Sequence, residues 1–496
     1  MKTVKESFGS MLILLLISCS NSANEPEPSN NNLELTGISS EVKAEGGKMT
    51  LQVKSNSEWE ITHNCDWLTI TPNSGDACQE NPISVELNYE FNFYDQRDAM
   101  VTLSGKNSND KKEYKITQPK YTRAQTKYQV GDPEVTFDVT QYDESYKYYD
   151  LMLTWKNAGK EGGIPHIEDQ LKNNIKTFTP NSKTDDIIKY FEDNENNPVT
   201  VLLKSGEYYF DKTLRIYNNQ TLIGENVDKV IINVPKEVGA DVGSIVSMYN
   251  AKNAGIRNLT IIGRWLNEDG ENYPKYNDNA HEELPGMGGF RTINISGDNC
   301  ENCFVDNIKL INNASHPIWL FGNNHTIRNV EIDGAFCKDG GCQGYFFIGG
   351  ENNLITNCRV TNIRHISFQG EECTKNVFYD NDLRQEVSFH VGDGGDNLIE
   401  NNRIYIPPTM IDAYNAIMGP WSVQHYVGGL NFIYNNKCKE DNPGRNGATP
   451  WSDDQLYLGP YEVSVGTNNP TRYTNFRPVP SEDIPNGKTL YPIILE

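Results

Sequence analysis

The stretch from Arg291 to Ile404 repeats one short phrase, and this repeat constrains the fold more than any other feature of the chain. In each copy a strand-like run ends in a polar turn, and a second run of the form Asn or Asp, apolar or Asn, charged, apolar follows. The second runs begin at intervals of 21 to 28 residues, at Asn307, Asn329, Asn357, Asp380 and Asn401, with outlying copies at Asn258 and Asn435. A period of roughly 20–30 residues that carries strands and few helix signals is the signature of a solenoid.

One such unit cannot bury its own apolar face, so it must stack on copies of itself. Stacked coils pair strand on strand in parallel, about 4.8 Å apart. Period-2 alternation directs Glu331 outward and its apolar neighbours inward. We therefore predict an all-β chain whose C-terminal part is a right-handed parallel β-helix. The second position of the phrase becomes Asn381, Asn402 and Asn436 in the later copies, which predicts an internal ladder of stacked amides.

The residues before the repeat have the features of an entry to such a solenoid. Asp185–Glu192 predicts a short helix with acidic residues at its N-terminal end. A buried strand at Val199–Leu203, a Gly-x-Tyr turn at Gly206–Tyr208 and a Leu-Ile-Gly strand follow. These elements resemble the entry to the pectate-lyase-like β-helix superfamily, over roughly residues 184–440. The resemblance implies the fold and leaves the reaction open, because the superfamily contains lyases, hydrolases, epimerases and binding proteins.

Residues 1–18 have the pattern of a signal peptide, with lysines before the apolar run Met11–Ile17. The run ends in Leu-Ile-Ser-Cys, which resembles a bacterial lipobox with Cys19 as the lipidated residue; the alternative is a plain secretory signal with an incidental cysteine. Residues 19–33 form a polar tether that resembles those of Bacteroidetes surface lipoproteins. We therefore expect an extracytoplasmic protein, lipid-anchored to the outer membrane at the cell surface.

Residues 34–119 contain successive alternating runs that predict a compact β-sandwich. The phrases Ser55–Trp59 and Trp67–Pro72, with the closing Ile116–Gln118, resemble the BACON domain, an immunoglobulin-like module common in Bacteroidetes glycan-degrading proteins. The resemblance implies either glycan attachment or a spacer that lifts an enzyme off the membrane. The two tryptophans fall inside alternating strands, so they are predicted to be core residues.

The remaining segments carry weaker signals. Residues 120–183 are predicted to be a connector that packs on the first coil, with strands at Glu134–Val139 and Leu151–Trp155. The β-helix is expected over residues 184–460, followed by a C-terminal tail over residues 461–496. The net charge of −23 argues against nucleic-acid binding. We expect a monomer.

Ten cysteines are present, and an oxidising exterior favours disulfides. Two bridges are predicted: Cys65–Cys78 and Cys337–Cys342. Cys300 and Cys303 are open between a local bridge and a four-cysteine zinc site with the second pair. No cofactor is firmly predicted. Gly392–Asn397 has the composition of a calcium loop without EF-hand spacing, so it is interpreted as a tight turn, and the metal stays unknown.

Three insertions point to the functional side of the solenoid. They span Arg264–Gly289, the loop around Cys337–Cys342, and Pro407–Pro420. Each follows a second run and precedes the next strand, so all three are predicted to leave the solenoid at one corner. Long loops grouped on a rigid scaffold are where function usually lies.

Two outward columns are predicted to border that corner. The first column contains Lys309, Glu331, Arg359, Asp382, Arg403 and Lys437. The second follows from aligning Phe347, Phe368 and Phe389, which places side by side the pairs His365 and Glu386, Ser367 and Ser388, and Gln369 and His390. In this alignment Trp319 and Phe346 occupy the outward slot of Ser367, where aromatic rings suit stacking on sugars; the alternative is burial under a loop.

These columns allow three interpretations. In a lyase, a base such as His365, oriented by Glu386, removes the proton α to a uronate carboxylate. The enolate is then neutralised by calcium or by cations, here Lys309, Arg359 or Arg403. In an inverting hydrolase, Glu331 and Asp382, two coils and roughly 9.6 Å apart, act as the carboxylate pair. In the third interpretation the first column is a solvated ladder of paired charges.

Known motifs do not decide between these interpretations. The coils from Arg291 to Ile404 lack the Asn-Thr-Asp, Asp-Asp and Gly-His-Gly set of polygalacturonase-type hydrolases. They also lack the Arg-x-Pro-x-x-Arg pattern of pectate lyases. We predict a carbohydrate-active enzyme that acts on a polysaccharide, with a lyase on a uronic-acid glycan favoured over a hydrolase. The alternative is a non-catalytic glycan-binding or adhesion protein.

Overall fold

The computed structural model describes residues 32–106, 109–172, 174–235, 238, 242–263, 289–336, 344–408, 415–420, 425–441, 454–463 and 473–495. The chain divides into two compact units, residues 1–123 and 124–496. The predicted signal peptide and Cys19 lie outside the described residues, as do Cys337 and Cys342 of the second predicted disulfide. Within the described part of the chain, no helix is long and apolar enough to cross a membrane.

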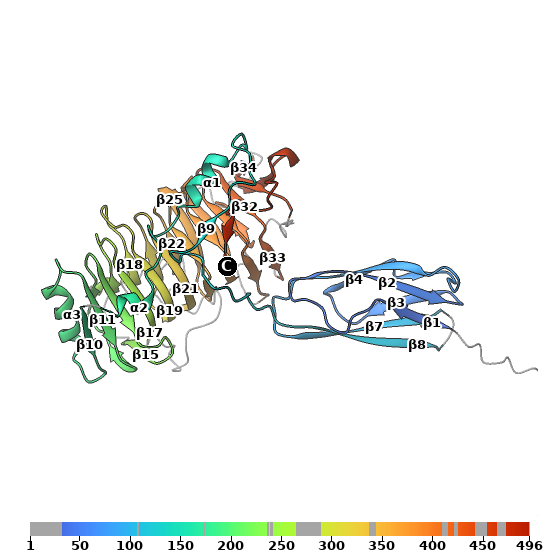
Figure 1. Cartoon of the computed structure of the whole chain (residues 1–496), viewed down its shortest axis with the longest axis horizontal. Coiled ribbons are helices and arrows are strands. Elements are labelled where there is room, and N and C mark those ends of the chain that lie inside the picture. The colour runs from blue at the N-terminus through green and yellow to red at the C-terminus, as the bar shows by residue number, and fades with distance from the viewer. Residues whose placement is uncertain are drawn as a thin grey trace, which may run out of the picture. The chain divides into compact units, whose positions relative to one another are not determined.

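The first unit is a sandwich of two antiparallel sheets (Figure 1). One sheet has the order β1 (Leu33–Thr36), β2 (Gly47–Ser55), β6 (Ile83–Tyr89) and β4 (Leu68–Thr71). The other has the order β5 (Ser74–Gly75), β3 (Trp59–His63), β7 (Arg97–Gly105) and β8 (Lys111–Gln118). Alternate residues of these strands point into one apolar core. Trp59 and Trp67 are buried in it, as predicted.

The predicted bridge between Cys65 and Cys78 is wrong, because both thiols are free. Cys78 is buried, and its thiol donates a hydrogen bond to the carbonyl oxygen of Val53 at 3.2 Å. Cys65 is half-buried, with its sulfur 4.0 Å from Nδ1 of His63. The two side chains lie in different surroundings, so their short separation in sequence does not bring the sulfurs together.

The second unit is a parallel β-helix, as predicted, with coils that stack along one axis (Figure 1). Its smaller sheet, here called the eight-stranded sheet, contains β13 (Leu214–Arg215), β16 (Ser244–Ser247), β18 (Arg291–Ile295), β20 (His316–Leu320), β22 (Tyr345–Ile348), β25 (His365–Thr374), β28 (Val387–Gly395) and β31 (Ile417–Met418). The interior of the β-helix is a continuous apolar column, to which each coil contributes inward residues such as Ile318, Phe346 and Ile366.

The larger sheet, here called the long sheet, covers the other sides of each coil. It begins with β10 (Ile175–Phe178), β11 (Val199–Leu203), β12 (Gly206–Tyr209), β14 (Gln220–Gly224), β15 (Val230–Val234), β17 (Gly255–Gly263), β19 (Phe304–Asn313) and β21 (Thr326–Ala335). It continues with β23 (Leu354–Thr356), β24 (Arg359–Thr361), β26 (Val377–Tyr379), β27 (Asp382–Arg384), β29 (Leu398–Glu400), β30 (Arg403–Ile406), β32 (Asn431–Tyr434) and β33 (Lys437–Glu440). Two antiparallel strands close it, β34 (Tyr457–Val463) and β35 (Tyr473–Pro478).

The asparagine that opens each repeated phrase is a left-handed turn residue. Asn307, Asn329, Asn357 and Asn401 have φ between 53° and 59°. Asparagine tolerates this backbone region better than most residues. Asn357 separates β23 from β24 and Asn401 separates β29 from β30, whereas Asn307 and Asn329 lie within β19 and β21. Each predicted insertion is preceded by a strand of the long sheet and followed by a strand of the eight-stranded sheet, so all three begin at one corner, as predicted. Residues 264–288, 337–343 and 409–414 of these insertions lie outside the described residues.

The predicted amide ladder is present: Asn381 Nδ2 donates to Asn402 Oδ1, and Asn402 Nδ2 donates to Asn436 Oδ1, each at 2.9 Å. A second ladder, missed in the sequence, runs through Asn353, Asn376, Asn397 and Asn431 at the opposite turn of the coils. Both ladders are buried.

We expect Asn376→Leu to lower the free energy of unfolding of the β-helix by about 2–4 kcal/mol. Asn376 Nδ2 donates to Gly350 O and Asn397 Oδ1, and its Oδ1 accepts from the backbone N–H of Asn353. Leucine fills the space but leaves those buried groups without partners. Calorimetry measures the loss, with Asn299→Ala, an exposed asparagine on the same solenoid, as the control. Equal stability of the two variants would contradict a structural role for the ladder.

Segments outside the coils close the ends and one side of the solenoid. The helix α3 (Thr184–Asp193) was predicted, and it buries Ile187 and Phe191 against the first coil. The connector differs from its prediction. Residues 149–155 form the helix α1 (Tyr149–Trp155) rather than a strand, and Trp155 packs on Phe432 of a late coil. Only the end of the connector, with α2 (Ile167–Gln170) and β10, reaches the early coils.

The C-terminal segment returns to the connector. The short helix η3 (Ser481–Asp483) leads to β36 (Ile493–Ile494), which pairs with β9 (Thr136–Phe137). Both carboxylate oxygens of Glu400 accept from the backbone N–H of Leu490 at 3.1 Å. Burial raises the pKa of Glu400 to about 7, and hydrogen bonds from this segment oppose that rise only in part.

Glu400 therefore makes the stability of the fold dependent on pH. Its folded pKa lies above the ordinary value of 4.5, so the folded state holds the proton longer than the unfolded state. The contribution of Glu400 to the free energy of unfolding is fully present below pH 4.5 and is lost as the pH rises from 4.5 to about 7. We expect the unfolding free energy of Glu400→Gln, relative to the wild type, to increase by about 3 kcal/mol from low to high pH. Denaturant titrations at several pH values measure it, and a constant difference would contradict the assignment.

Candidate active site

The outward face of the eight-stranded sheet carries a group of buried titratable side chains. Tyr345 and His365 are neighbours on β22 and β25, and Glu386 directly precedes β28. In the next row, strand pairing aligns Trp319, Phe347, Ser367 and Ser388. One continuous face therefore carries aromatic rings at one end and polar groups at the other.

His365 lies beside Glu386, as predicted. Nδ1 of His365 is hydrogen-bonded to Oε1 of Glu386, and both side chains are almost fully buried. The second carboxylate oxygen of Glu386 accepts from Nε2 of Gln385. A carboxylate on Nδ1 fixes the tautomer of an imidazole and directs its other nitrogen away from the carboxylate. The pair has the form of a base and the group that orients it.

His390 joins this pair from the end of the same face. Its ring centroid lies 4.9 Å from that of His365, 4.4 Å from that of His425 and 5.7 Å from that of Tyr345. Burial, followed by the charges of His365, His425 and Arg364, lowers the pKa of His390 to about 2. His390 is therefore neutral at physiological pH. Its Nδ1 is buried and has no hydrogen-bond partner among the described residues.

A phenol and a guanidinium complete the cluster. Burial raises the pKa of Tyr345, and the charge of Arg364 partly opposes this. The guanidinium carbon of Arg364 lies 5.5 Å from the centroid of the Tyr345 ring. The hydroxyls of Ser367 and Ser388 are buried without a partner in the described part of the chain. Buried orphan polar groups are rare in folded proteins and mark places where a ligand or water binds. We call Tyr345, Arg364, His365, Glu386 and His390 the histidine cluster.

Aromatic rings extend the face toward the earlier coils. The rings of Trp319 and Phe347 stack with centroids 4.0 Å apart at an interplanar angle of 17°. Phe321 stacks on Phe347 at 5.1 Å, and the guanidinium of Arg291 lies 4.4 Å from the Trp319 ring. Trp319 and Phe321 are half-buried. Such a surface suits the apolar faces of sugar rings.

Two register predictions are wrong. Phe346 points into the core and is fully buried, and Phe347 takes the outward place, because Phe347 pairs with Ser367 rather than with Phe368. One coil is thus one residue shorter than the alignment assumed. Gln369 pairs with Val391 rather than His390, because the strand has an irregularity after Phe368 that makes His390 an extra residue.

The first predicted column has the predicted register but lies on the long sheet, away from the histidine cluster. Lys309, Glu331, Arg359, Asp382, Arg403 and Lys437 follow one another from coil to coil. Ion pairs occupy much of it. Lys309 Nζ lies 2.6 Å from Asp228, and buried Arg403 binds Asp380 at 2.7 Å and also binds Asp382. The structure therefore brings His365, Glu386 and His390 together and does not bring the first column to them.

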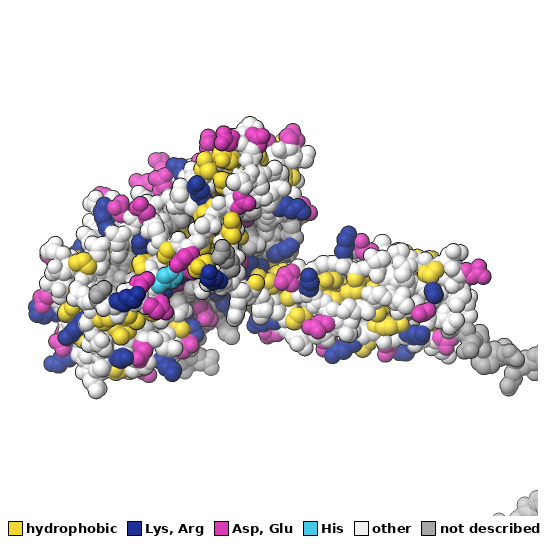
Figure 2. Space-filling model, in the orientation of Figure 1, with side chains coloured by type: hydrophobic (Ala, Val, Ile, Leu, Met, Phe, Trp, Pro, Cys, Tyr) yellow, Lys and Arg dark blue, Asp and Glu magenta, His cyan; other side chains and the backbone are white. Residues whose placement is uncertain are grey.

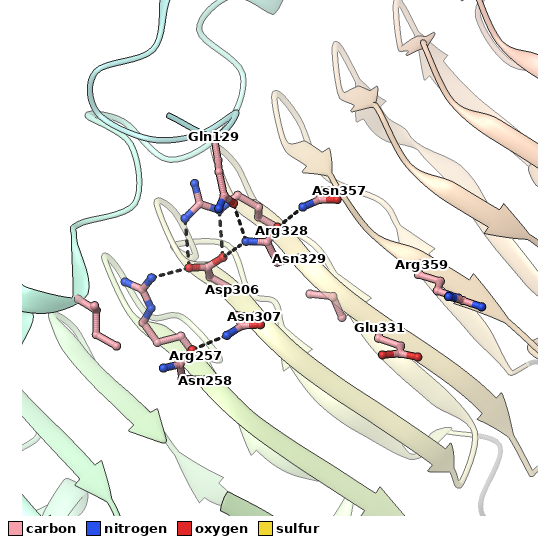
Figure 3. A pocket seen from close by; sticks show the side chains of 12 residues that line it. Gln129, Arg257, Asn258, Asp306, Asn307, Arg328, Asn329, Glu331, Asn357 and Arg359 are labelled. Atoms are coloured by element: carbon pink, nitrogen blue, oxygen red, sulfur yellow. Dashed lines mark hydrogen bonds and ion pairs between the residues drawn. The ribbon is translucent and has the colours of Figure 1, made fainter. Parts of the chain in front are cut away.

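Beside this column lies a pocket of about 540 Å³ (Figure 3). It contains a buried ion network. The carboxylate of Asp306 accepts from Arg257 NH2 at 2.6 Å and from Arg328 Nε at 3.0 Å. Arg328 NH1 also donates to Asp132 of the connector at 2.6 Å.

Figure 2 shows acidic and basic side chains interspersed over the visible face, without a patch of one sign.

The sequence did not single out Tyr345, Arg364 or His425. Tyr345 precedes His365 by the same interval that separates Phe347 from Ser367, so the correct alignment would have found it. His425 follows an insertion, where the period gives no register. Cys337 and Cys342, which the zinc alternative requires, lie outside the described residues. The described residues include no group of three or more potential metal ligands, and Cys300 and Cys303 are free. Asp393 Oδ1 accepts from the N–H of Gly395 at 2.8 Å and from Asn431 at 3.0 Å.

Comparison with known proteins gives one family match. Residues 32–118 match the family described as the viral BACON domain, which confirms the BACON-like prediction. No curated protein matches the chain.

Several solved structures are similar at low identity. The catalytic domain of a GH87 alpha-1,3-glucanase with tetrasaccharides is 11% identical, with a TM-score of 0.36 over 83% of this chain and 73% of that one. The A-module of the mannuronan C-5 epimerase AlgE4 from Azotobacter vinelandii is 14% identical, with a TM-score of 0.32 over 53% and 87%. A Bacteroides ovatus GH5 xyloglucanase with a heptasaccharide is 12% identical, with a TM-score of 0.16 over 55% and 71%. At these values the neighbours assign no reaction to this chain.

Proposed function

We propose that this chain is a carbohydrate-active enzyme that cleaves a uronic-acid polysaccharide by β-elimination in the histidine cluster. The observation that carries the proposal is the buried hydrogen bond between His365 and Glu386. Beside it lies His390, whose pKa burial lowers and whose Nδ1 has no hydrogen-bond partner among the described residues. Perturbed titratable groups that converge on one face favour a catalytic site over a purely adhesive one.

Each step of the proposed β-elimination can be assigned to a residue of the histidine cluster. The imidazole of His365, oriented by Glu386, takes the proton from the carbon α to the uronate carboxylate. The electrons form a carbon–carbon double bond, and the bond to the leaving sugar oxygen breaks. Tyr345 gives its proton to that oxygen, and Arg364 stabilises the negative charge that develops on the carboxylate. Ser367 and Ser388 bind sugar hydroxyls, and Trp319 with Phe321 stacks on neighbouring sugar rings.

Hydrolysis is less well supported. A two-carboxylate mechanism needs a second carboxyl group at roughly 5–9.5 Å from the first. Glu386 is the one carboxylate of the histidine cluster, and both its oxygens already accept hydrogen bonds from His365 and Gln385. The predicted pair Glu331 and Asp382 lies on the long sheet, where Asp382 is bound by Arg403.

The second candidate function is glycan binding without turnover. The half-buried rings of Trp319 and Phe321 favour it, because stacking alone retains a sugar. In either case we propose that Cys19 carries a lipid, that the BACON domain acts as a spacer or glycan attachment module, and that the protein works as a monomer at the cell surface.

Digestion of a panel of uronic-acid and neutral polysaccharides tests the proposal. We expect ultraviolet absorbance of unsaturated products to rise together with reducing ends, on a uronate polymer only. Parallel reactions with EDTA show whether calcium takes part. Reducing ends without absorbance would replace elimination by hydrolysis, and binding without either signal would leave the glycan-binding protein.

A further inference from the structure

The pocket in Figure 3 lies on the long sheet, and its walls are preformed. Its volume of about 540 Å³ falls within the usual size of small-ligand sites. The carboxylate of Asp306 accepts hydrogen bonds from the guanidinium groups of Arg257 and Arg328 and so fixes their positions. Asn329 Nδ2 donates to Gln129 Oε1 of the connector and to Asp306 Oδ1, each at 2.9 Å. These groups need no rearrangement to receive a ligand, which lowers the entropic cost of binding.

Arg359 is the unengaged cation of this pocket. Its side chain is exposed and makes no hydrogen bond or ion pair with the described residues. Glu331, its neighbour on the preceding coil, lies 4.0 Å from Lys309 and has no closer charged partner in the described chain. Figure 3 shows both side chains apart from the ion network, on adjacent strands.

The lining matches a sugar that carries a carboxylate. Three guanidinium groups and two carboxylates line the pocket, and Asp132 of the connector adds a third carboxylate by binding Arg328. The charges of Arg257 and Arg328 are thus met within the network, and Arg359 is the guanidinium that a ligand can bind. A guanidinium binds a carboxylate through two parallel hydrogen bonds. The amides of Asn258, Asn307 and Gln129 offer the donors and acceptors that sugar hydroxyls need. The lining includes no aromatic side chain, so binding here depends on polar contacts.

We propose that this pocket is a second saccharide-binding site, separate from the histidine cluster, that holds an acidic sugar unit through Arg359. The identity of the sugar as a uronate rests on the proposed function, whereas the location of the site does not. A second site on the long sheet keeps a polymer on the protein while another part of it is in the histidine cluster, and two linked contacts bind more tightly than either alone.

Hydrogen exchange of the full-length protein, followed by mass spectrometry, tests this proposal by location. The probes are short oligosaccharides of galacturonate, mannuronate and guluronate, and the same oligosaccharides with their carboxyl groups reduced. We expect an acidic oligosaccharide to slow exchange in peptides that cover β21 and residues 354–361. Arg359→Ala is expected to raise the ligand concentration needed for that effect about tenfold, because it removes both charge-assisted hydrogen bonds of an exposed guanidinium. Lys309→Ala, which removes a charge from the same column outside the pocket lining, is the control.

The outcomes separate this site from the proposed function. Protection of β21 that Arg359→Ala removes, and that the reduced sugars do not produce, supports the second site even if no polysaccharide is cleaved. Protection confined to β25 and β28 overturns it and leaves the histidine cluster as the binding site. Equal loss of protection in Arg359→Ala and Lys309→Ala overturns it as well, because a general charge effect then explains the binding. No protection by any probe also overturns it.

Discussion

Replacing His365 by alanine is expected to lower the rate of polysaccharide cleavage by about 10²–10⁴-fold, the usual contribution of a general base. His365 is the imidazole whose Nδ1 is held by the buried carboxylate of Glu386. Alanine removes the proton acceptor, and Glu386→Gln removes the charge that orients it. Initial rates at saturating substrate measure the loss, and the melting temperature of each variant shows whether the β-helix stays folded.

A matched control exists elsewhere in the same unit. His166 also binds a carboxylate, Glu134, at 2.7 Å, but both groups are substantially exposed. We expect His166→Ala to leave the rate unchanged within a factor of about two, because surface pairs of this kind contribute little. A folded His365→Ala variant that retains the wild-type rate would exclude His365 as the base and move attention to His390.

The second large effect concerns stability. Asp306→Asn is expected to lower the free energy of unfolding of the β-helix by about 3–5 kcal/mol. Asp306 is 1% exposed, and its carboxylate lies between the guanidinium groups of Arg257 and Arg328. Asparagine keeps the size but leaves two buried cations with one fewer opposing charge.

Denaturant unfolding measures this loss, and Glu331→Gln is the control. Glu331 is on the same side of the long sheet, but its side chain is 45% exposed and its partner Lys309 is 4.0 Å away. We expect the control to change stability by less than about 0.5 kcal/mol. If the two variants lose similar stability, the network around Asp306 does not hold the connector to the solenoid.

The solenoid could be predicted from the sequence because its asparagines recur for two structural reasons. Each coil needs a left-handed turn residue, and each stacked amide needs a partner above and below it. Those needs recur once per coil and leave a period in the sequence. The second ladder left the same signal at Asn353, Asn376 and Asn397, where each asparagine follows a residue with positive φ.

The candidate site was only partly predictable, because it depends on register across coils of unequal length. One coil is one residue shorter than the alignment assumed, and successive strand residues face opposite sides. Phe347 rather than Phe346 therefore lies on the outward face. Alternation along the strand placed His390 on the outward face, but the irregularity after Phe368 pairs Gln369 with Val391 instead, and no period predicts such an irregularity. The connector could not be placed from sequence either, because Trp155 packs on Phe432, far away along the chain.

Digestion in water labelled with oxygen-18 tests the central claim most directly. β-Elimination adds no water to the broken bond, whereas hydrolysis adds one. We expect mass spectrometry of the products of a uronic-acid polysaccharide to show unsaturated ends without heavy oxygen, and His365→Ala to form these products about 10²–10⁴-fold more slowly. One heavy oxygen per bond cleaved, with saturated ends, would contradict proton abstraction in the histidine cluster and require a hydrolytic site elsewhere on the chain.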